Sequence, residues 1–570
     1  PLPARSSAKR MNVMKNALGA LMRFADARPR IFLAALALLA ALPGISAIPP
    51  LDRDESRFAQ ATKQMLETGD FIEIRFQDEA RNKKPVGIYW LQAASVMAFG
   101  HVENGRVEAG IWAWRVPSVI GAVIAVLFCF QAGLVLFGHR TALWGAALFA
   151  VTALMVGEAH IAKTDAVLAA CITAMMAALA RVFMDHRKQL RAPAATAFLF
   201  WAALGTGLLI KGPVAFMVAG LAIVWLAIRE KGAGWLMALR PLWGVPLALL
   251  IVAPWAIAIT IETDGAFWTE AIFGDLAPKL AGGQEKHWGP PGYYLATFFI
   301  MFFPGTLLIL PAVRHAWQQR KNDAIIFLIA WIVPGFLVFE AIPTKLPHYV
   351  LPLYPAFALL IADFLVRPRG PELSGLRRAN IALWLLIALA FAAAITLLPA
   401  YMGQGPGIPD YVLTVILAAL AMLAALLAAM REDRKALATA GVMALALYAA
   451  ATMRSVHLVD SIQISSRVAA ALHAAYPDGL PPVATAGFSE PSLVFLTATT
   501  TRLGRGTNAA AFLAETPTGV VAAESRRQEE FLAECARLGV AVESFGEVRG
   551  VNYSRGDNTV ITLYRRKSGT

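Results

Sequence analysis

Cysteine is scarce in this chain of 570 residues, and charged side chains are sparse. The three cysteines, Cys129, Cys171 and Cys535, lie far apart and show no spacing typical of a disulfide framework or a metal site. Only 16% of the residues are charged, whereas 58% are hydrophobic and the mean hydropathy is +0.58. One water-soluble core could not bury so much apolar surface. The composition therefore favours a protein that folds in a lipid bilayer.

Motifs for nucleotide and nucleic-acid binding are also missing. No glycine-rich phosphate loop is present, and the net charge of +13 is not gathered into a recognisable nucleic-acid module. We expect no nucleic-acid partner. No internal repeat is visible, which weakens the case for a transporter built from repeated halves without excluding it.

Long apolar runs are what the sequence has in abundance, and each is long enough to cross a bilayer as a helix. We predict thirteen spans, with cores at 31–48, 116–137, 143–156, 166–184, 195–210, 214–228, 242–260, 295–313, 325–342, 350–366, 381–399, 412–430 and 437–452. The apolar stretch 86–99 is shorter, so we expect an interfacial or re-entrant helix there. The predicted fold class is an α-helical polytopic membrane protein.

Lysine and arginine set the predicted orientation, because they favour the cytoplasmic side of short loops. The N-terminal arm is basic, and every second loop after it is short and basic as well. An odd number of spans then places the C-terminal segment on the side opposite the N-terminus. We divide the chain into a transmembrane domain, 1–454, with surface helices at about 50–100, and a small soluble α/β domain, 455–570. In the latter, 518–523 and 559–564 are typical of strands and 526–538 of a helix.

Three acidic residues on the outer side are candidate catalytic groups. After two prolines end the first span, Asp54 and Glu55 begin a helix that we expect to lie on the membrane surface up to Gly69. An N-cap and a first-turn acid are the structural alternative for this pair. Asp165 stands at the start of an apolar span, where an ionisable group is costly unless it faces water or a partner.

Cationic residues gather on the same side, and we expect them to form a phosphate site beside the carboxylates. They are Arg57, Arg75, Lys83, Lys84, Lys211 and Lys345. Lys211 and Lys345 lie in very short loops, which favours anion binding, whereas Lys83 can equally be solvated at the interface. Tyr349, close to Lys345 and His348, is the aromatic residue that we assign to the site. His348, His287 and Lys279 are tentative cavity residues.

Six short motifs, in order along the chain, resemble a known family. They are DESRFA (54–59), LETGDF (66–71), KPVGIYWL (84–91), KTD (163–165), LIKGP (209–213) and TKLPHYVLP (344–352). Together they resemble the GT-C glycosyltransferases that use polyprenyl-phosphate sugars, in particular the aminoarabinose transferases of lipid A within the protein mannosyltransferase-like superfamily.

The resemblance implies an enzyme of the bacterial inner membrane, with its N-terminus in the cytoplasm and its catalytic cavity and soluble domain in the periplasm. It implies an undecaprenyl-phosphate sugar as donor and lipid A as acceptor, with lipopolysaccharide modification and polymyxin resistance as the consequence. Asp54 would be the essential acid and Asp165 its assistant. Arg57, Lys84, Lys211 and Tyr349 would line the phosphates.

The chain departs from the family at two places. It has Lys83-Lys84-Pro85 where the family often has Glu-Lys-Pro, and at best Asp275 and Lys279 where the family has a histidine and an arginine. Aminoarabinose is therefore one candidate sugar beside galacturonic acid and a hexose, and a protein or polysaccharide acceptor also fits. We expect no obligatory metal, although the carboxylates could bind a divalent cation. A lipid transporter and an envelope scaffold or sensor are the alternatives from other functional classes.

Overall fold

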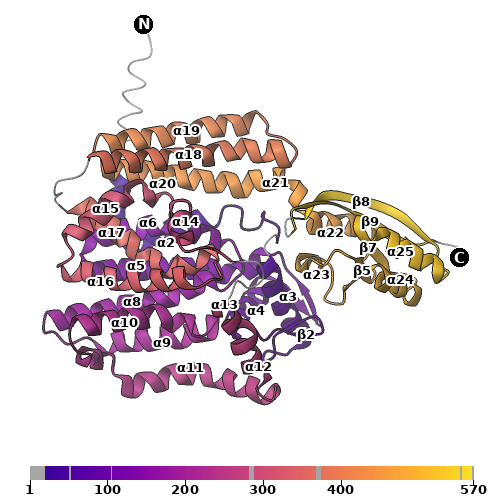
Figure 1. Cartoon of the computed structure of the whole chain (residues 1–570), viewed down its shortest axis with the longest axis horizontal. Helices are drawn as coiled ribbons and strands as arrows, with labels where there is room; N and C mark the ends of the chain where they lie inside the picture. The colour runs from indigo at the N-terminus through magenta and orange to yellow at the C-terminus, as the bar shows by residue number, and fades with distance from the viewer. Residues whose placement is uncertain are drawn as a thin grey trace, which may run out of the picture.

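The computed structural model describes residues 19–50, 53–103, 105–281, 288–367, 374–552 and 555–567. Long helices run side by side through most of the molecule, and a small sheet domain is attached at one end of the bundle (Figure 1). The predicted fold class, a polytopic helical membrane protein with a small C-terminal sheet domain, is confirmed.

The main helices of the bundle are α2 (Pro29–Ala41), α5 (Trp112–Leu136), α6 (His139–Ala150), α7 (Ala153–Ala159), α8 (Asp165–Arg187), α9 (Ala194–Lys211), α10 (Val214–Arg229), α11 (Pro241–Glu262), α14 (Tyr293–Met301), α15 (Ile309–Gln318), α16 (Asp323–Ala341), α17 (Tyr354–Val366), α18 (Ser374–Met402), α19 (Ile408–Ala429) and α20 (Asp433–Ala450). The connecting elements are α3 (Arg53–Thr68), β1 (Arg75–Phe76), β2 (Glu79–Ala80), α4 (Gly87–Phe99), β3 (His101–Glu103), β4 (Arg106–Glu108), η1 (Gly234–Leu239), α12 (Ala266–Thr269), η2 (Glu270–Leu276), α13 (Ala277–Ala281), η4 (Gly305–Leu308), η5 (Pro347–Leu353), η6 (Ala451–Ser455), α21 (Val456–Leu458) and η7 (Asp460–Ile462).

Each predicted span coincides with a helix or a bent pair of helices. Among the described residues, nine helices are long and apolar enough to cross a membrane, and up to eleven if the bent pairs α6–α7 and α14–α15 each count as one span. The helices α2 and α10 are shorter. The first helix ends at Ala41, before the predicted 48, because Pro43 and Gly44, which has a φ of 80°, interrupt it.

Helix α8 lies at the centre of the bundle, and 89% of its most apolar stretch of 18 residues is buried. Its many alanines allow close helix packing. A Cβ added to Gly121 of α5 would lie only 2.8 Å from the backbone nitrogen of Val167, so the two backbones nearly touch. The first residue of α8, Asp165, is consequently held by a rigid element.

A buried ion pair fixes α3 to this bundle. Arg115 of α5 donates from Nε and Nη2 to the two carboxylate oxygens of Glu55, at 2.8 and 2.9 Å. The same guanidinium donates to the carbonyls of Ile45 and Ile48, and the backbone N–H of Ala162 donates to Glu55. Both side chains are almost completely buried. These contacts give Glu55 a structural role, and the catalytic role suggested by the sequence stays a prediction.

The C-terminal part folds around a mixed five-stranded sheet of order β6-β5-β7-β9-β8. Its elements are α22 (Ile464–Ala475), β5 (Val483–Ala486), α23 (Pro491–Leu496), β6 (Arg502–Gly504), α24 (Gly506–Glu515), β7 (Val520–Glu524), α25 (Ser525–Arg537), β8 (Val542–Asn552) and β9 (Asp557–Arg566). The strands β6, β5 and β7 are parallel, whereas β9 pairs antiparallel with both β7 and β8. The predicted strands and helix near 518–564 are confirmed.

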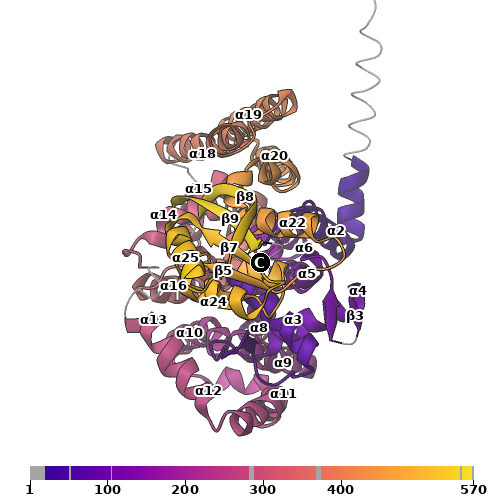
Figure 2. The ribbon, with the colours of Figure 1, turned by 90° about the vertical axis from the view of Figure 1, so that its right-hand side faces the viewer.

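This sheet domain contacts α3 through its α23–β6 segment. Thr499 accepts a hydrogen bond from Gln60 at 2.7 Å and donates one to Glu67 at 2.6 Å. Arg53 forms an ion pair with Glu490 at 3.2 Å, and the rings of Trp114 and Phe495 meet edge to face. Figure 2 shows the domain in front of the bundle, beside α3.

We predict that Glu55→Gln destabilises the protein strongly. The substitution leaves the buried Arg115 guanidinium without its counter-charge, which costs about 3 kcal/mol of folding free energy. A thermal-unfolding scan in detergent should show a clear drop in Tm, while the half-exposed neighbour variant Asp54→Asn should unfold near the wild-type temperature. A Glu55→Gln protein of normal Tm that has lost its activity would restore the catalytic assignment of Glu55.

Candidate functional site

Asp54 lies in the first turn of α3, one residue before the buried Glu55, and its side chain is 46% exposed. Arg57, one turn further along, approaches it at 3.5 Å. Burial raises the pKa of Asp54, but the positive charges of Arg81, Lys163 and Arg57 outweigh that effect, so the pKa lies below its usual range. The carboxylate is therefore ionised at neutral pH.

Asp165 is the second acid of the site and is buried at the N-terminus of α8. Lys211, the last residue of α9, donates a hydrogen bond to its Oδ1 at 2.5 Å. The Nζ of Lys211 also lies 5.4 Å from the centre of the Tyr349 ring, a cation–π distance. Three of the predicted residues, Asp165, Lys211 and Tyr349, are thus brought together from distant parts of the chain.

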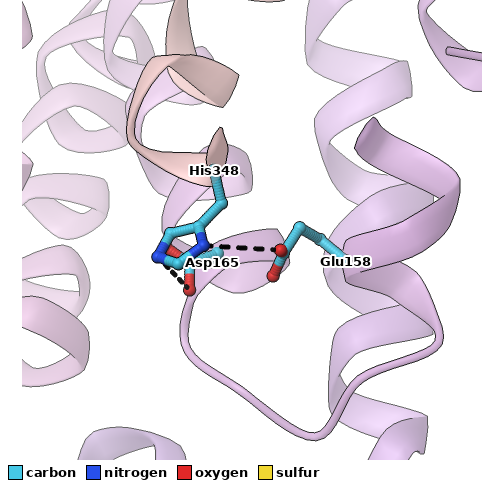
Figure 3. Close-up of side chains that lie close together, drawn as sticks. All are labelled: Glu158, Asp165 and His348. Atoms are coloured by element: carbon cyan, nitrogen blue, oxygen red, sulfur yellow. Dashed lines mark ion pairs between the residues drawn. The ribbon is translucent and has the colours of Figure 1, made fainter. Parts of the chain in front are cut away.

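His348 stands between two carboxylates (Figure 3). Its Nε2 is 3.8 Å from Asp165, and its Nδ1 is 3.7 Å from Glu158. Glu158 in turn lies 3.7 Å from Lys163. The tentative residue His348 therefore lies directly beside the second acid, and Glu158 and Lys163 extend the cluster.

Glu158, Asp165 and His348 are the described residues that could hold a metal ion, because one ligand atom of each lies within 4.8 Å of the others. Two features of the cluster oppose such an ion. The imidazole directs a different nitrogen at each carboxylate, whereas one ion would take only one of them, and Lys163 and Lys211 already balance the two negative charges.

A second group of charges surrounds Asp275. Lys84 contacts one carboxylate oxygen at 3.0 Å and Lys279 the other at 2.6 Å. Burial and the nearby charges of Lys279 and Lys211 lower the pKa of Lys84 to about 8, although Asp275 acts in the opposite direction. Because Lys211 acts on Lys84 and pairs with Asp165, the two charge clusters are neighbours.

The guanidinium of Arg81 is a site group that the sequence-based selection missed. It lies 5.3 Å from the centre of the Phe58 ring and is the first of the nearby charges that lower the pKa of Asp54. The sequence has a basic run at 81–84, but gave no signal that Arg81 would approach Asp54.

Other predicted residues lie elsewhere. Lys345 is buried and donates to the carbonyls of Phe339 and Glu340, so it caps the C-terminus of α16 and does not contact the two clusters. Arg75 is partly exposed and pairs with Glu73 at 3.3 Å. Lys83 is half-buried in the loop that carries Lys84. His287 lies outside the described residues.

Among the described residues of the assembled site, positive charge exceeds negative charge. Six cationic side chains (Arg57, Arg81, Lys84, Lys163, Lys211 and Lys279) surround four carboxylates (Asp54, Glu158, Asp165 and Asp275). A site with such a surplus can stabilise a bound phosphate and the negative charge that develops on a departing one.

Comparison with known proteins agrees with this chemistry. Residues 83–257 match the family model described as dolichyl-phosphate-mannose-protein mannosyltransferase. An undecaprenyl phosphate-alpha-4-amino-4-deoxy-L-arabinose arabinosyl transferase of Pectobacterium carotovorum is 28% identical, covering 62% of this chain and 61% of that protein. The same-named protein of Aeromonas salmonicida is 30% identical over 62% of this chain and 65% of its own length. The chain thus spans about three fifths of the curated relatives that it matches first.

The fold also has solved counterparts. The crystal structure of ArnT from Cupriavidus metallidurans bound to undecaprenyl phosphate superimposes with a TM-score of 0.69, at 17% identity, covering 93% of this chain and 97% of that one. The apo form gives a TM-score of 0.68. The chain therefore has the fold of a GT-C glycosyltransferase and resembles the aminoarabinose transferases in sequence and in structure.

Proposed function

We propose that this membrane protein transfers 4-amino-4-deoxy-L-arabinose from undecaprenyl phosphate to a phosphate of lipid A, at the periplasmic face of the bacterial inner membrane. Support comes from the similarity to arabinosyl transferases and from the surplus of cationic groups around Asp54 and Asp165. The cationic surroundings of Asp54, with Arg57 at 3.5 Å, are the observation that carries the choice of acceptor.

The reaction forms one C–O bond and breaks another. An oxygen of the acceptor phosphate attacks the anomeric carbon of the sugar, and the bond to the lipid phosphate breaks with its electron pair moving to the phosphate oxygen. Arg57, Lys84 and Lys211 neutralise the negative charge that remains on the departing lipid phosphate. Asp165 holds the Lys211 ammonium in position through their hydrogen bond.

The pKa of Asp54 favours a phosphate acceptor over a hydroxyl acceptor. A carboxylate of lowered pKa is a weak general base, and a hydroxyl group would need a base. A phosphate monoester has a second pKa of about 6 and is already largely ionised at neutral pH. Asp54 then acts by orienting the reactants and by its charge.

The cluster around Asp275 favours a second candidate sugar, galacturonic acid. Both oxygens of Asp275 are taken by Lys84 and Lys279, so this part of the site offers cationic groups to a sugar carboxylate. A lipid transporter fits less well, because the central helix α8 carries no charged residue from 166 to 180, so it does not line a charged path across the membrane.

We predict that Asp54→Asn and Lys211→Gln each lower kcat/KM for sugar transfer at least about a hundredfold, as expected when one group that stabilises the transition state is lost. Transfer of radiolabelled sugar from extracted polyprenyl-phosphate donors to lipid A by purified protein in lipid measures this. Arg75→Gln is the matched control, because Arg75 is paired outside the clusters, and it should retain activity. Full activity of a folded Asp54→Asn variant would refute the proposed role of Asp54 in sugar transfer.

The pH dependence of kcat/KM should show the titration of Lys84. This side chain binds phosphate only when protonated, so kcat/KM should be high below its pKa and fall as the pH rises through about 8. Lys84→Arg keeps its charge throughout that range and should move the alkaline decline upward. An unchanged alkaline limb in Lys84→Arg would assign the titration to another group.

Metal removal tests the ion-paired state of the Glu158–Asp165–His348 cluster. We expect transfer to stay within about twofold after treatment with a chelator, because two lysines already balance the carboxylates. Loss of activity that a single added divalent metal restores would instead make this cluster a metal site.

A further inference from the structure

A second charged cavity lies at the other end of α8, far from the candidate site. The helix has 23 residues, so its C-terminal end is about 33 Å from Asp165, one membrane thickness away. Here a cavity of about 310 Å³ opens between the end of α8, the loop before α9, η1 and the start of α11. His186, Arg191, Trp235 and Arg240 provide its polar lining.

The lining of this cavity carries positive charge and no carboxylate. Neither Arg191 nor Arg240 forms an ion pair or a side-chain hydrogen bond with any residue that the structure describes. The acids nearby are already used, since Glu230 and Asp323 pair with Arg187 and Asp185 pairs with Arg181. Both arginines are exposed, so the cavity offers two positive charges to an anion.

Two further features shape the same place. Trp235 is 7% exposed, lines the cavity and stacks on His186. Arg240 caps the N-terminus of the 22-residue helix α11 in a left-handed conformation, so the positive end of that helix also points to this region.

The rim of the cavity is apolar and exposed. Leu190, which lines the cavity, is 58% exposed. Met237, next to the lining residue Ala238, and Leu242, two residues after Arg240, are 61% and 88% exposed. A small soluble anion would leave these side chains in water. A molecule with a charged head and hydrocarbon tails would satisfy both the basic cavity and its rim.

We propose that this cavity binds the phosphate of an anionic phospholipid in the leaflet opposite the candidate site. The lipid phosphate accepts hydrogen bonds from Arg191 and Arg240, and its acyl chains cover Leu190, Met237 and Leu242. The helix α11 lies at the edge of the bundle (Figure 1), and only 22% of its most apolar stretch of 18 residues is buried. A lipid at its N-terminus therefore supplies packing that the protein itself does not provide.

A titration of the purified full chain with dioleoylphosphatidylglycerol, followed by native mass spectrometry, tests the proposal. We expect the wild type to bind this lipid at least tenfold more tightly than zwitterionic dioleoylphosphatidylcholine. The double variant Arg191→Gln/Arg240→Gln should lose about tenfold or more in affinity for phosphatidylglycerol. Arg191→Gln alone, in an exposed loop, should show a smaller loss and guards against misfolding of the double variant.

The matched control is Arg229→Gln/Lys231→Gln, which removes two charges between α10 and η1 that neither line the cavity nor form an ion pair within the described chain. Its affinity for phosphatidylglycerol should equal that of the wild type. Equal losses in both double variants would show non-specific surface attraction and overturn the proposal, as would unchanged binding by the Arg191 variants. If inorganic phosphate displaced phosphatidylglycerol at a concentration similar to that of the lipid, the cavity would be a site for a soluble anion, and the proposal of a lipid site would be wrong.

Discussion

The buried pair of Arg115 and Glu55 is the interaction on which the candidate site depends. One guanidinium, on α5, holds the segment that follows α2, through Ile45 and Ile48, and the carboxylate of α3. That carboxylate also accepts from the backbone of Ala162, in the segment that leads to α8. Four parts of the chain therefore meet at one charge pair, and the first turn of α3 is fixed relative to Asp165.

The same pair explains why two adjacent acids have different roles. Successive residues of a helix point about 100° apart, so when Glu55 faces the bundle, Asp54 faces a different environment. Glu55 is 2% exposed and saturated by Arg115, while Asp54 is half-exposed among cations. Removing a buried partner charge disturbs folding, whereas removing a half-exposed charge costs little folding free energy. From the sequence alone the two carboxylates were equivalent candidates.

What could be predicted from the sequence was set by local pattern. Apolar run length located the helices, and the acids and prolines near residue 50 located α3, because both signals depend on neighbouring residues. Contacts between residues that are distant in sequence could not be predicted from these local patterns. His348 meets Glu158 across 190 positions, and Lys345 turns back to cap α16, although both lysines in short outer loops had looked alike. Only the packing of α8 against its neighbours decides that Lys211 faces the acid.

The contacts of the sheet domain with α3 bear on the envelope-scaffold alternative. Thr499 bonds to Gln60 and Glu67, and Arg53 pairs with Glu490, so the helix that presents Asp54 is held by the bundle on one side and by this domain on another. Deleting residues 455–570 would expose these polar partners and loosen α3 even if the domain had no chemistry of its own. Loss of transfer after such a deletion is therefore compatible with a positioning role. The double substitution Thr499→Val/Glu490→Gln removes the hydrogen bonds to Gln60 and Glu67 and the ion pair with Arg53, without deleting the domain. A fall in transfer in that variant, with the domain still folded, would support positioning, whereas unchanged transfer would oppose it.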